Sequence, residues 1–320
     1  MSKVTTGAPA RSSESFDVFR QVVAFSTSDS WKRVPHVSYL YEPDVTDFIA
    51  FYRESCRTVV RATGETQKIT FNTVLLKLVA EALAAAPRLN AFLRYNAFSV
   101  RGRLTVQKHV NITVPWLLPD GKVLTVVVPH VEEKSVSDLQ SAIDQLSTRI
   151  SSSDVREVLG RTSLRDTVDR ILDGEREGIK RIISVALGLT RITLLKGAER
   201  RRYYARDPAE RLTEHDIATG TVVVSNIGSI QSGVPGKFGL LDVITPQVFA
   251  VGISAIEERP GIVRDADGHK TIGIRSFLPF CLVFDHRAFE LGELLPFVRR
   301  LDEIFARPQE LIPLIGGVTP

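Results

Sequence analysis

Cysteine and long apolar runs are both scarce in this sequence of 320 residues. Its two cysteines, Cys56 and Cys281, are too few for a disulfide framework or a four-cysteine metal site. No uncharged run reaches the roughly 18 residues of a membrane-spanning helix. The first residues, MSKVTTGAPARSSESFDVF, contain no apolar core of a secretion signal. These absences predict a cytoplasmic protein.

A large excess of charge of one sign is also missing. The 41 basic and 37 acidic residues leave a formal net charge of +4, which gives little support to a dedicated nucleic-acid binder. Zinc-finger, P-loop and basic-helix patterns are absent. His109, His130, His215 and His269 do not follow the spacing of metal ligands, so no metal site is expected.

The order of strand-like and helical segments predicts a single α/β domain with a mixed sheet. Residues 1–16 are small and polar and are expected to be disordered. Residues 17–320 contain no linker that would divide them into two domains. Short strands with long crossovers and interleaved helices are typical of an α/β domain.

Three helices are expected in the first half of the chain. The first should include Val59 and end near Gly64. The second lies in TFNTVLLKLVAEALAAAPRLN, where an unbroken apolar stripe ends at Pro87. The third begins with Ser135 or Ser137 as its cap.

The segment 150–212 differs in texture from the rest of the chain. Residues 171–206 carry nine basic and four acidic side chains, an excess of +5. The apolar part, Ile182 to Leu195, is too short to span a bilayer. One interpretation is a helical hairpin that packs on the domain or on a neighbouring subunit. The other is contact with anionic lipid, with the phosphates of CoA or with an acidic partner.

Two stretches carry residues that could do chemistry. An apolar run from Phe277 to Phe284 stops at Asp285-His286-Arg287, so a buried strand delivers one imidazole to the edge of the core. In TVVVSNIGS, a β-branched strand ends at Ser225, whose hydroxyl could donate to an oxyanion. Taken alone, His286 could also be a surface histidine, and Ser225 could bond its own backbone.

Together these stretches resemble a known family. SNIG, ITPQVFAVGISAIEERP and a later strand ending in DHR resemble the catalytic domains of dihydrolipoyl acyltransferases. These domains are core subunits of 2-oxo acid dehydrogenase complexes and relatives of chloramphenicol acetyltransferase. RVPHVSYLYEPDVTDF, ITFNTVLLKLVAEALAAAPRLNAFL, VNITVPWLLPDGKVLTVVVPHVEEKSVSDL and RLTEHDIATGTVVVSNIG look like further blocks of the family, in its order. The resemblance covers roughly residues 17–150 and 210–310.

The resemblance implies a fold, an activity and an assembly. The fold is a chloramphenicol acetyltransferase-like two-layer α/β sandwich, with helices packed on one side of a mixed sheet. The activity is CoA-dependent acyl transfer to a thiol of the dihydrolipoamide kind or to another acceptor, without an acyl-enzyme. The assembly is a homotrimer or a larger set of trimers with the active site between subunits. The lipoyl group would come from another, lipoyl-bearing protein, since no lipoyl domain precedes the catalytic part here.

The resemblance also implies roles for individual residues. His286 would be the general base, Ser225 the oxyanion donor and Glu290 the catalytic acid four positions after the histidine. The remaining site residues fall into two groups: Asn226, Gly228 and His36 would bind substrate, and Asp285 and Arg287 would support the site.

The turn after His286 departs from the family's pattern. Position 290 is a glutamate, one methylene longer than the usual aspartate, and Leu291 stands where a glycine is expected, with Gly292 one place late. This difference motivates an alternative: a weakly active or inactive scaffold subunit of a multimeric assembly.

Overall fold

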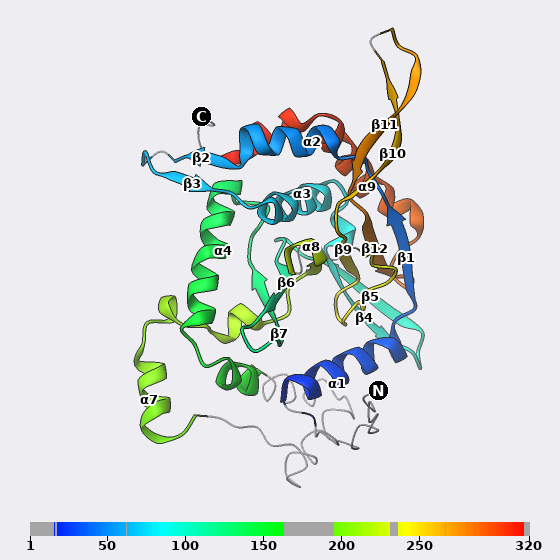
Figure 1. Cartoon of the computed structure of the whole chain (residues 1–320). Helices are drawn as coiled ribbons and strands as arrows, with labels where there is room; N and C mark the ends of the chain where they lie inside the picture. Colours follow the sequence, from blue (N-terminus) through cyan, green and yellow to red (C-terminus); the bar gives the residue numbers. More distant parts are fainter. Residues whose placement is uncertain are drawn as a thin grey trace, which may run out of the picture.

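A six-stranded sheet forms the centre of the molecule, and helices surround it (Figure 1). The computed structural model describes residue 16 and residues 18–61, 63–162, 195–230, 236–265 and 267–316. The sheet consists of β1 (His36–Tyr41), β12 (Phe280–Asp285), β9 (Phe249–Ile253), β8 (Val222–Asn226), β6 (Ile112–Leu117) and β7 (Val123–Val128), in that order. The longer helices are α1 (Val18–Arg33), α3 (Phe71–Ala85), α4 (Val136–Ser151), α7 (Gly197–Ala205) and α9 (Leu291–Ala306).

The sheet is mixed. β8 runs parallel to both β6 and β9, whereas the β1–β12, β12–β9 and β6–β7 pairs are antiparallel. The predicted α/β class is therefore confirmed.

The two faces of the sheet have different covers. On one face, Phe280 of β12 and Phe249 of β9 pack against Phe305 and Phe297 of α9. α9 lies on α3, which in turn contacts α4 (Figure 1). Because side chains alternate along a strand, Cys281 and its odd-numbered neighbours face the other way. That second face is covered by a smaller apolar cluster that includes Val34, after α1, and side chains of residues 236–244.

Local sequence signals set several element ends. The Thr70 hydroxyl accepts from Thr73 N–H at the start of α3. Of the two predicted caps of α4, Ser135 is the one that accepts from Asp138 N–H. The expected turn at PDG forms, and Gly121 has a φ of 80°. None of the described helices is both long and apolar enough to cross a membrane.

The first predicted helix is shorter than expected. α2 (Thr46–Phe51) continues as a π-helical turn, Tyr52–Cys56, and ends there. Val59 instead lies in β2 (Thr58–Val60), which pairs with β3 (Thr66–Lys68). The run Thr58-Val59-Val60 is β-branched, so its side chains favour a strand once a pairing partner is present.

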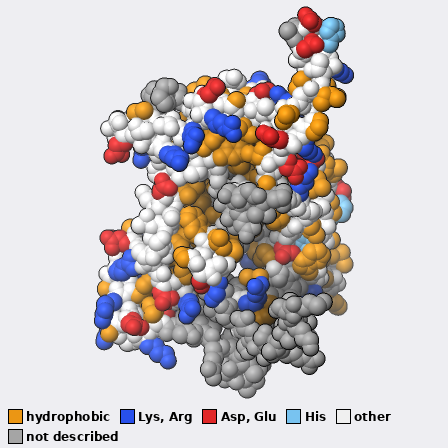
Figure 2. Space-filling view, in the orientation of Figure 1, with side chains coloured by type: hydrophobic (Ala, Val, Ile, Leu, Met, Phe, Trp, Pro, Cys, Tyr) orange, Lys and Arg blue, Asp and Glu red, His pale blue; other side chains and the backbone are white. Residues whose placement is uncertain are grey.

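Two further ribbons extend from the sheet. β4 (Ala91–Asn96) pairs with β5 (Arg101–Val106), and β10 (Glu257–Arg264) pairs with β11 (Lys270–Phe277). The β10–β11 hairpin projects from the body of the molecule, and Figure 2 shows hydrophobic side chains along it. The described part of the chain also contains the short helices α8 (Ile227–Ile230) and α10 (Ile312–Ile315) and the 3-10 turns Pro87–Leu89, Pro208–Glu210, Glu214–Ile217 and Pro308–Leu311.

Candidate active site

His286 follows directly after β12, and its ring is oriented by the turn that it opens. Its backbone N–H donates to Pro35 O at 3.0 Å, and its Nδ1 lies 2.9 Å from Phe289 O. A carbonyl oxygen can only accept, so Nδ1 carries the proton in the neutral ring. The exposed ring therefore has its unprotonated nitrogen, Nε2, available as a base.

The residues on either side of His286, Asp285 and Arg287, form an ion pair with each other. Asp285 is 1% exposed, and Arg287 donates to both of its carboxylate oxygens, at 2.9 Å from Nε and 2.6 Å from Nη2. The guanidinium also lies over the ring of Tyr95, 5.0 Å from its centroid. Each charge compensates the other, so the pair holds the backbone on both sides of His286.

Glu290 lies at the start of α9. Its backbone N–H donates to Glu293 Oε2 at 3.1 Å, and Glu293 also pairs with Arg88 at 2.7 Å. The Glu290 side chain is exposed, and in the described part of the chain no hydrogen bond joins it to His286. The structure thus gives Glu290 a place at the helix N-terminus, where a negative charge is favourable.

Ser225 and Asn226 end β8. Ser225 is half-buried and lies opposite Gly252 of β9. Asn226 is buried, and its Nδ2 donates to Asn72 Oδ1 at 2.9 Å, which ties the end of β8 to the start of α3. Asn72 is a partner that no sequence signal identified. Gly228 follows in α8 and is exposed.

Ser225 and His286 do not meet within one chain. Ser225, Gly252 and Cys281 lie in one row across the sheet, and His286 comes five residues after Cys281. β12 runs antiparallel to β8, so the two residues lie toward opposite ends of the sheet. With about 3.3 Å per residue along a strand and about 4.8 Å between strands, their Cα atoms are roughly 19 Å apart.

His36 lies near His286 but has a different set of contacts. It pairs with Asp285 in the β1–β12 register, and Trp31 lies against its ring at a centroid distance of 5.1 Å. Its Nε2 accepts from Val243 N–H at 3.0 Å, which anchors residues 236–244 against the sheet. Because this lone pair is engaged, His36 can position the loop but offers no free base at Nε2.

Neither cysteine is suited to be a nucleophile. Cys56 and Cys281 are 1% and 0% exposed, and burial raises the pKa of each thiol to about 11. Both stay protonated at neutral pH, so they act as packing residues.

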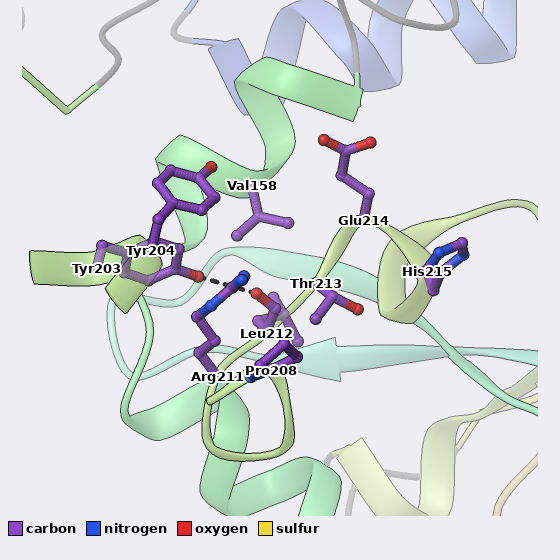
Figure 3. A pocket seen from close by; sticks show the side chains of 9 residues that line it. All are labelled: Val158, Tyr203, Tyr204, Pro208, Arg211, Leu212, Thr213, Glu214 and His215. Carbon is purple, nitrogen blue, oxygen red and sulfur yellow. Dashed lines mark hydrogen bonds between the residues drawn. The ribbon is translucent and has the colours of Figure 1, made fainter. Parts of the chain in front are cut away.

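A separate pocket of about 290 Å³ is lined by Val158, by Tyr203 and Tyr204 of α7, and by residues from Pro208 to His215 (Figure 3). Neither Ser225 nor His286 is among its lining residues. The Tyr203 hydroxyl donates to Leu212 O at 2.9 Å, and the Arg211 guanidinium lies 5.0 Å from the ring centre of Tyr204. The sequence predicted for this region either a packed helical hairpin or contact with anionic lipid, CoA phosphates or an acidic partner. Most of its apolar part, Ile182 to Leu195, lies outside the described residues.

Comparisons with known proteins agree on a family. A family model described as 2-oxoacid dehydrogenases acyltransferase (catalytic domain) matches residues 8–160 and 192–312. The dihydrolipoyllysine-residue acetyltransferase component of the pyruvate dehydrogenase complex of Haemophilus influenzae is 24% identical over 288 residues, 88% of this chain and 37% of that protein. The lipoamide acyltransferase component of the branched-chain alpha-keto acid dehydrogenase complex of Bacillus subtilis is 21% identical over 291 residues. That alignment covers 89% of this chain and 51% of the relative, so the chain spans only part of both.

Solved structures show the same fold. A probable dihydrolipoamide acetyltransferase from Listeria monocytogenes has a TM-score of 0.60 at 18% identity, covering 94% of this chain and 96% of that chain. The cubic core of the pyruvate dehydrogenase multienzyme complex has a TM-score of 0.56 at 21% identity, covering 98% of each chain.

Proposed function

The chain belongs to the family of 2-oxoacid dehydrogenase acyltransferase catalytic domains, and from this premise we propose that it moves an acyl group between CoA and a thiol. The acceptor would be of the dihydrolipoamide kind, carried by a lipoyl-bearing protein, or another nucleophile. The observation that carries this proposal is the 2.9 Å contact from His286 Nδ1 to Phe289 O, which leaves Nε2 as a proton acceptor.

In the proposed reaction, His286 Nε2 takes the proton from the attacking thiol. An ordinary thiol has a pKa near 8.5 and is mostly protonated at neutral pH, so a neighbouring base raises the thiolate fraction. The thiolate attacks the thioester carbonyl and forms a tetrahedral oxyanion. The C–S bond of the leaving thiolate then breaks, and the imidazolium returns the proton to that sulfur.

Ser225 of a second copy of the chain would donate its hydroxyl to the oxyanion. The separation of Ser225 and His286 within one chain supports a site built between copies. The solved cubic core supports assembly of such chains, as trimers or larger sets of trimers. Asn226 and Gly228 would bind substrate beside Ser225. His36 would hold residues 236–244 in place beside His286.

Work on the Azotobacter vinelandii dihydrolipoamide acetyltransferase, a structural neighbour, concerns a serine, a histidine and an asparagine four positions after that histidine in its catalytic mechanism. Glu290 has the same spacing from His286. We propose that Glu290 assists the reaction from the start of α9 without bonding to His286, while Asp285 and Arg287 hold the turn. Its lack of a bond to His286 favours the second candidate, a weakly active or inactive scaffold subunit.

The decisive experiment follows acyl transfer from a panel of acyl-CoAs to dihydrolipoamide. His286→Ala should lower kcat by about 10²- to 10⁴-fold, the usual contribution of a general base. His269→Ala, an exposed histidine on the β10–β11 hairpin, is the matched control and should keep wild-type rates. If wild type, His286→Ala and buffer give the same product across the panel, the scaffold function is supported and the catalytic one is wrong.

A further inference from the structure

Four potential metal ligands meet at the edge of the sheet formed by β6 and β7. His109 precedes β6, and His130, Glu132 and Glu133 lie in the turn after β7. One ligand atom from each residue lies within 4.8 Å of the other three. We propose that this cluster binds a divalent transition-metal ion with two imidazole and two carboxylate ligands, the donor set that suits zinc.

The ligand atoms are close enough together for one small ion, since one atom from each residue lies within 4.8 Å of the others. His109 Nδ1 lies 2.9 Å from Glu132 Oε1 and 3.1 Å from Glu133 Oε1, and His130 Nδ1 lies 3.4 Å from Glu133 Oε2. In a tetrahedral zinc site with bonds of about 2.0–2.1 Å, neighbouring ligand atoms are about 3.4 Å apart.

Contacts outside the cluster orient its ligands. Val110 N–H donates to Glu132 Oε2 at 2.9 Å, which leaves Oε1 directed at His109. Hydrogen bonds that fix a ligand in this way are typical of metal sites.

The backbone of the turn positions His130. His130 has a φ of 53°, a left-handed conformation that is uncommon for a residue other than glycine. Asn111 Oδ1 accepts from the backbone N–H of His130 at 3.0 Å, and Lys134 Nζ donates to Pro129 O at 2.6 Å. This held conformation stacks the His130 ring on that of His109, with centroids 4.1 Å apart.

A bound ion would act as a structural clamp. It would join the segment entering β6 to the turn leaving β7, at the edge of the sheet farthest from β1 and separated from β12 by other strands. The ligands remain reachable, because their side chains are between 23% and 58% exposed. A metal here should raise stability through binding to the folded state, without entering the acyl-transfer chemistry.

The test uses the full chain, freed of any affinity tag, treated with EDTA and dialysed. Calorimetric titration with ZnCl₂ should give one ion per chain at this site, and Co²⁺ should show the visible absorption of a tetrahedral site. His109→Gln with His130→Asn should weaken binding by about 100-fold or more, since loss of outer contacts alone costs about 10- to 100-fold. Asparagine is chosen at 130 because it tolerates left-handed backbone.

A control addresses the second group of possible ligands, Asp265, Asp267 and His269, at the exposed hairpin tip. Asp265→Asn with His269→Gln should leave the calorimetric titration and the cobalt spectrum unchanged. Thermal unfolding in EDTA shows whether each variant folds, and zinc should raise Tm for wild type and for this control only. The proposal is overturned if wild type binds no zinc, or if the His109/His130 variant folds and binds it as tightly as wild type.

Discussion

The carbonyl oxygen of Phe289, 2.9 Å from His286 Nδ1, determines which ring nitrogen can take a proton. The turn that makes this contact is held by the Asp285–Arg287 pair rather than by Glu290. The resemblance implied a catalytic role for Glu290, four positions after the histidine. At the residue scale, the acceptor that orients His286 is a backbone carbonyl, which a residue of any type at position 289 would supply.

Ser225→Ala tests the proposed oxyanion donor. Loss of one such donor should reduce kcat by about 10²- to 10³-fold, because the oxyanion loses a hydrogen bond that matters most in the transition state. KM should change less than kcat. The measurement is steady-state kinetics of acyl transfer. Ser276→Ala, a half-buried strand serine on β11, serves as the control, and an unchanged rate for Ser225→Ala would remove Ser225 from the site.

At the scale of elements, β8 lies close to β6 because residue 220 is a glycine. A Cβ at Gly220 would lie 2.5 Å from Asn111 O and 3.0 Å from Thr113 N, both backbone atoms. Gly220→Ala should therefore lower the free energy of unfolding by about 1–3 kcal/mol, as overpacking typically does. Denaturant unfolding measures this. Gly239→Ala, where an added Cβ meets nothing within 4 Å, should change stability little; equal stability for the two variants would contradict the prediction.

The helical segment 155–162 and α7 are joined by the buried carboxylate of Glu157. It accepts from Leu195 N–H at 2.6 Å, Arg161 Nε at 2.9 Å and the Tyr204 hydroxyl at 3.1 Å. Burial alone would raise the pKa of Glu157, but these donors together lower it. The stabilisation is therefore present at neutral pH and lost as pH falls through the lowered folded-state pKa, below the ordinary value of about 4.3.

Glu157→Gln should lower the free energy of unfolding by about 1–3 kcal/mol at pH 7, since buried donors lose a charged acceptor. Its stability should also vary less with pH under acidic conditions than that of wild type. Chemical unfolding at pH 7 and at several pH values from about 4 downward measures both effects. Parallel pH profiles for the two proteins would show that Glu157 does not carry this dependence.

At the scale of the whole molecule, a site shared between copies allows two inactive variants to restore activity when they assemble together. A site within one chain does not allow this. His286→Ala and Ser225→Ala chains should each be nearly inactive alone. In randomly mixed trimers, about a quarter of the interfaces would join an intact histidine to an intact serine. Co-expression of the two variants should thus restore activity to about a quarter of wild type.

The control for this experiment mixes the two variants after each has assembled, under conditions without subunit exchange, and should show no recovery. Mass measurement of the particles verifies that mixed assemblies exist. If mixed assemblies form and remain as inactive as the separate variants, the two residues do not share a site across copies.

Much of the local structure follows from the sequence alone. A continuous apolar run identified the buried strand before His286, Ser135 was one of two candidate caps, and the PDG turn followed from residues adjacent in the chain. The ordered blocks indicated the family that the matching family model identifies. These features depend on neighbours a few residues apart, or on a pattern long enough to be specific.

Only the tertiary structure decided which distant residues meet. Val59 became a strand residue because a partner strand was available, and His109 reached His130 because β6 and β7 pair edge to edge. Strand order likewise separated Ser225 from His286, although each lies at the end of a strand in the same sheet. Strand order and direction depend on pairings between segments far apart in the chain, and spacing along a single sequence does not encode them.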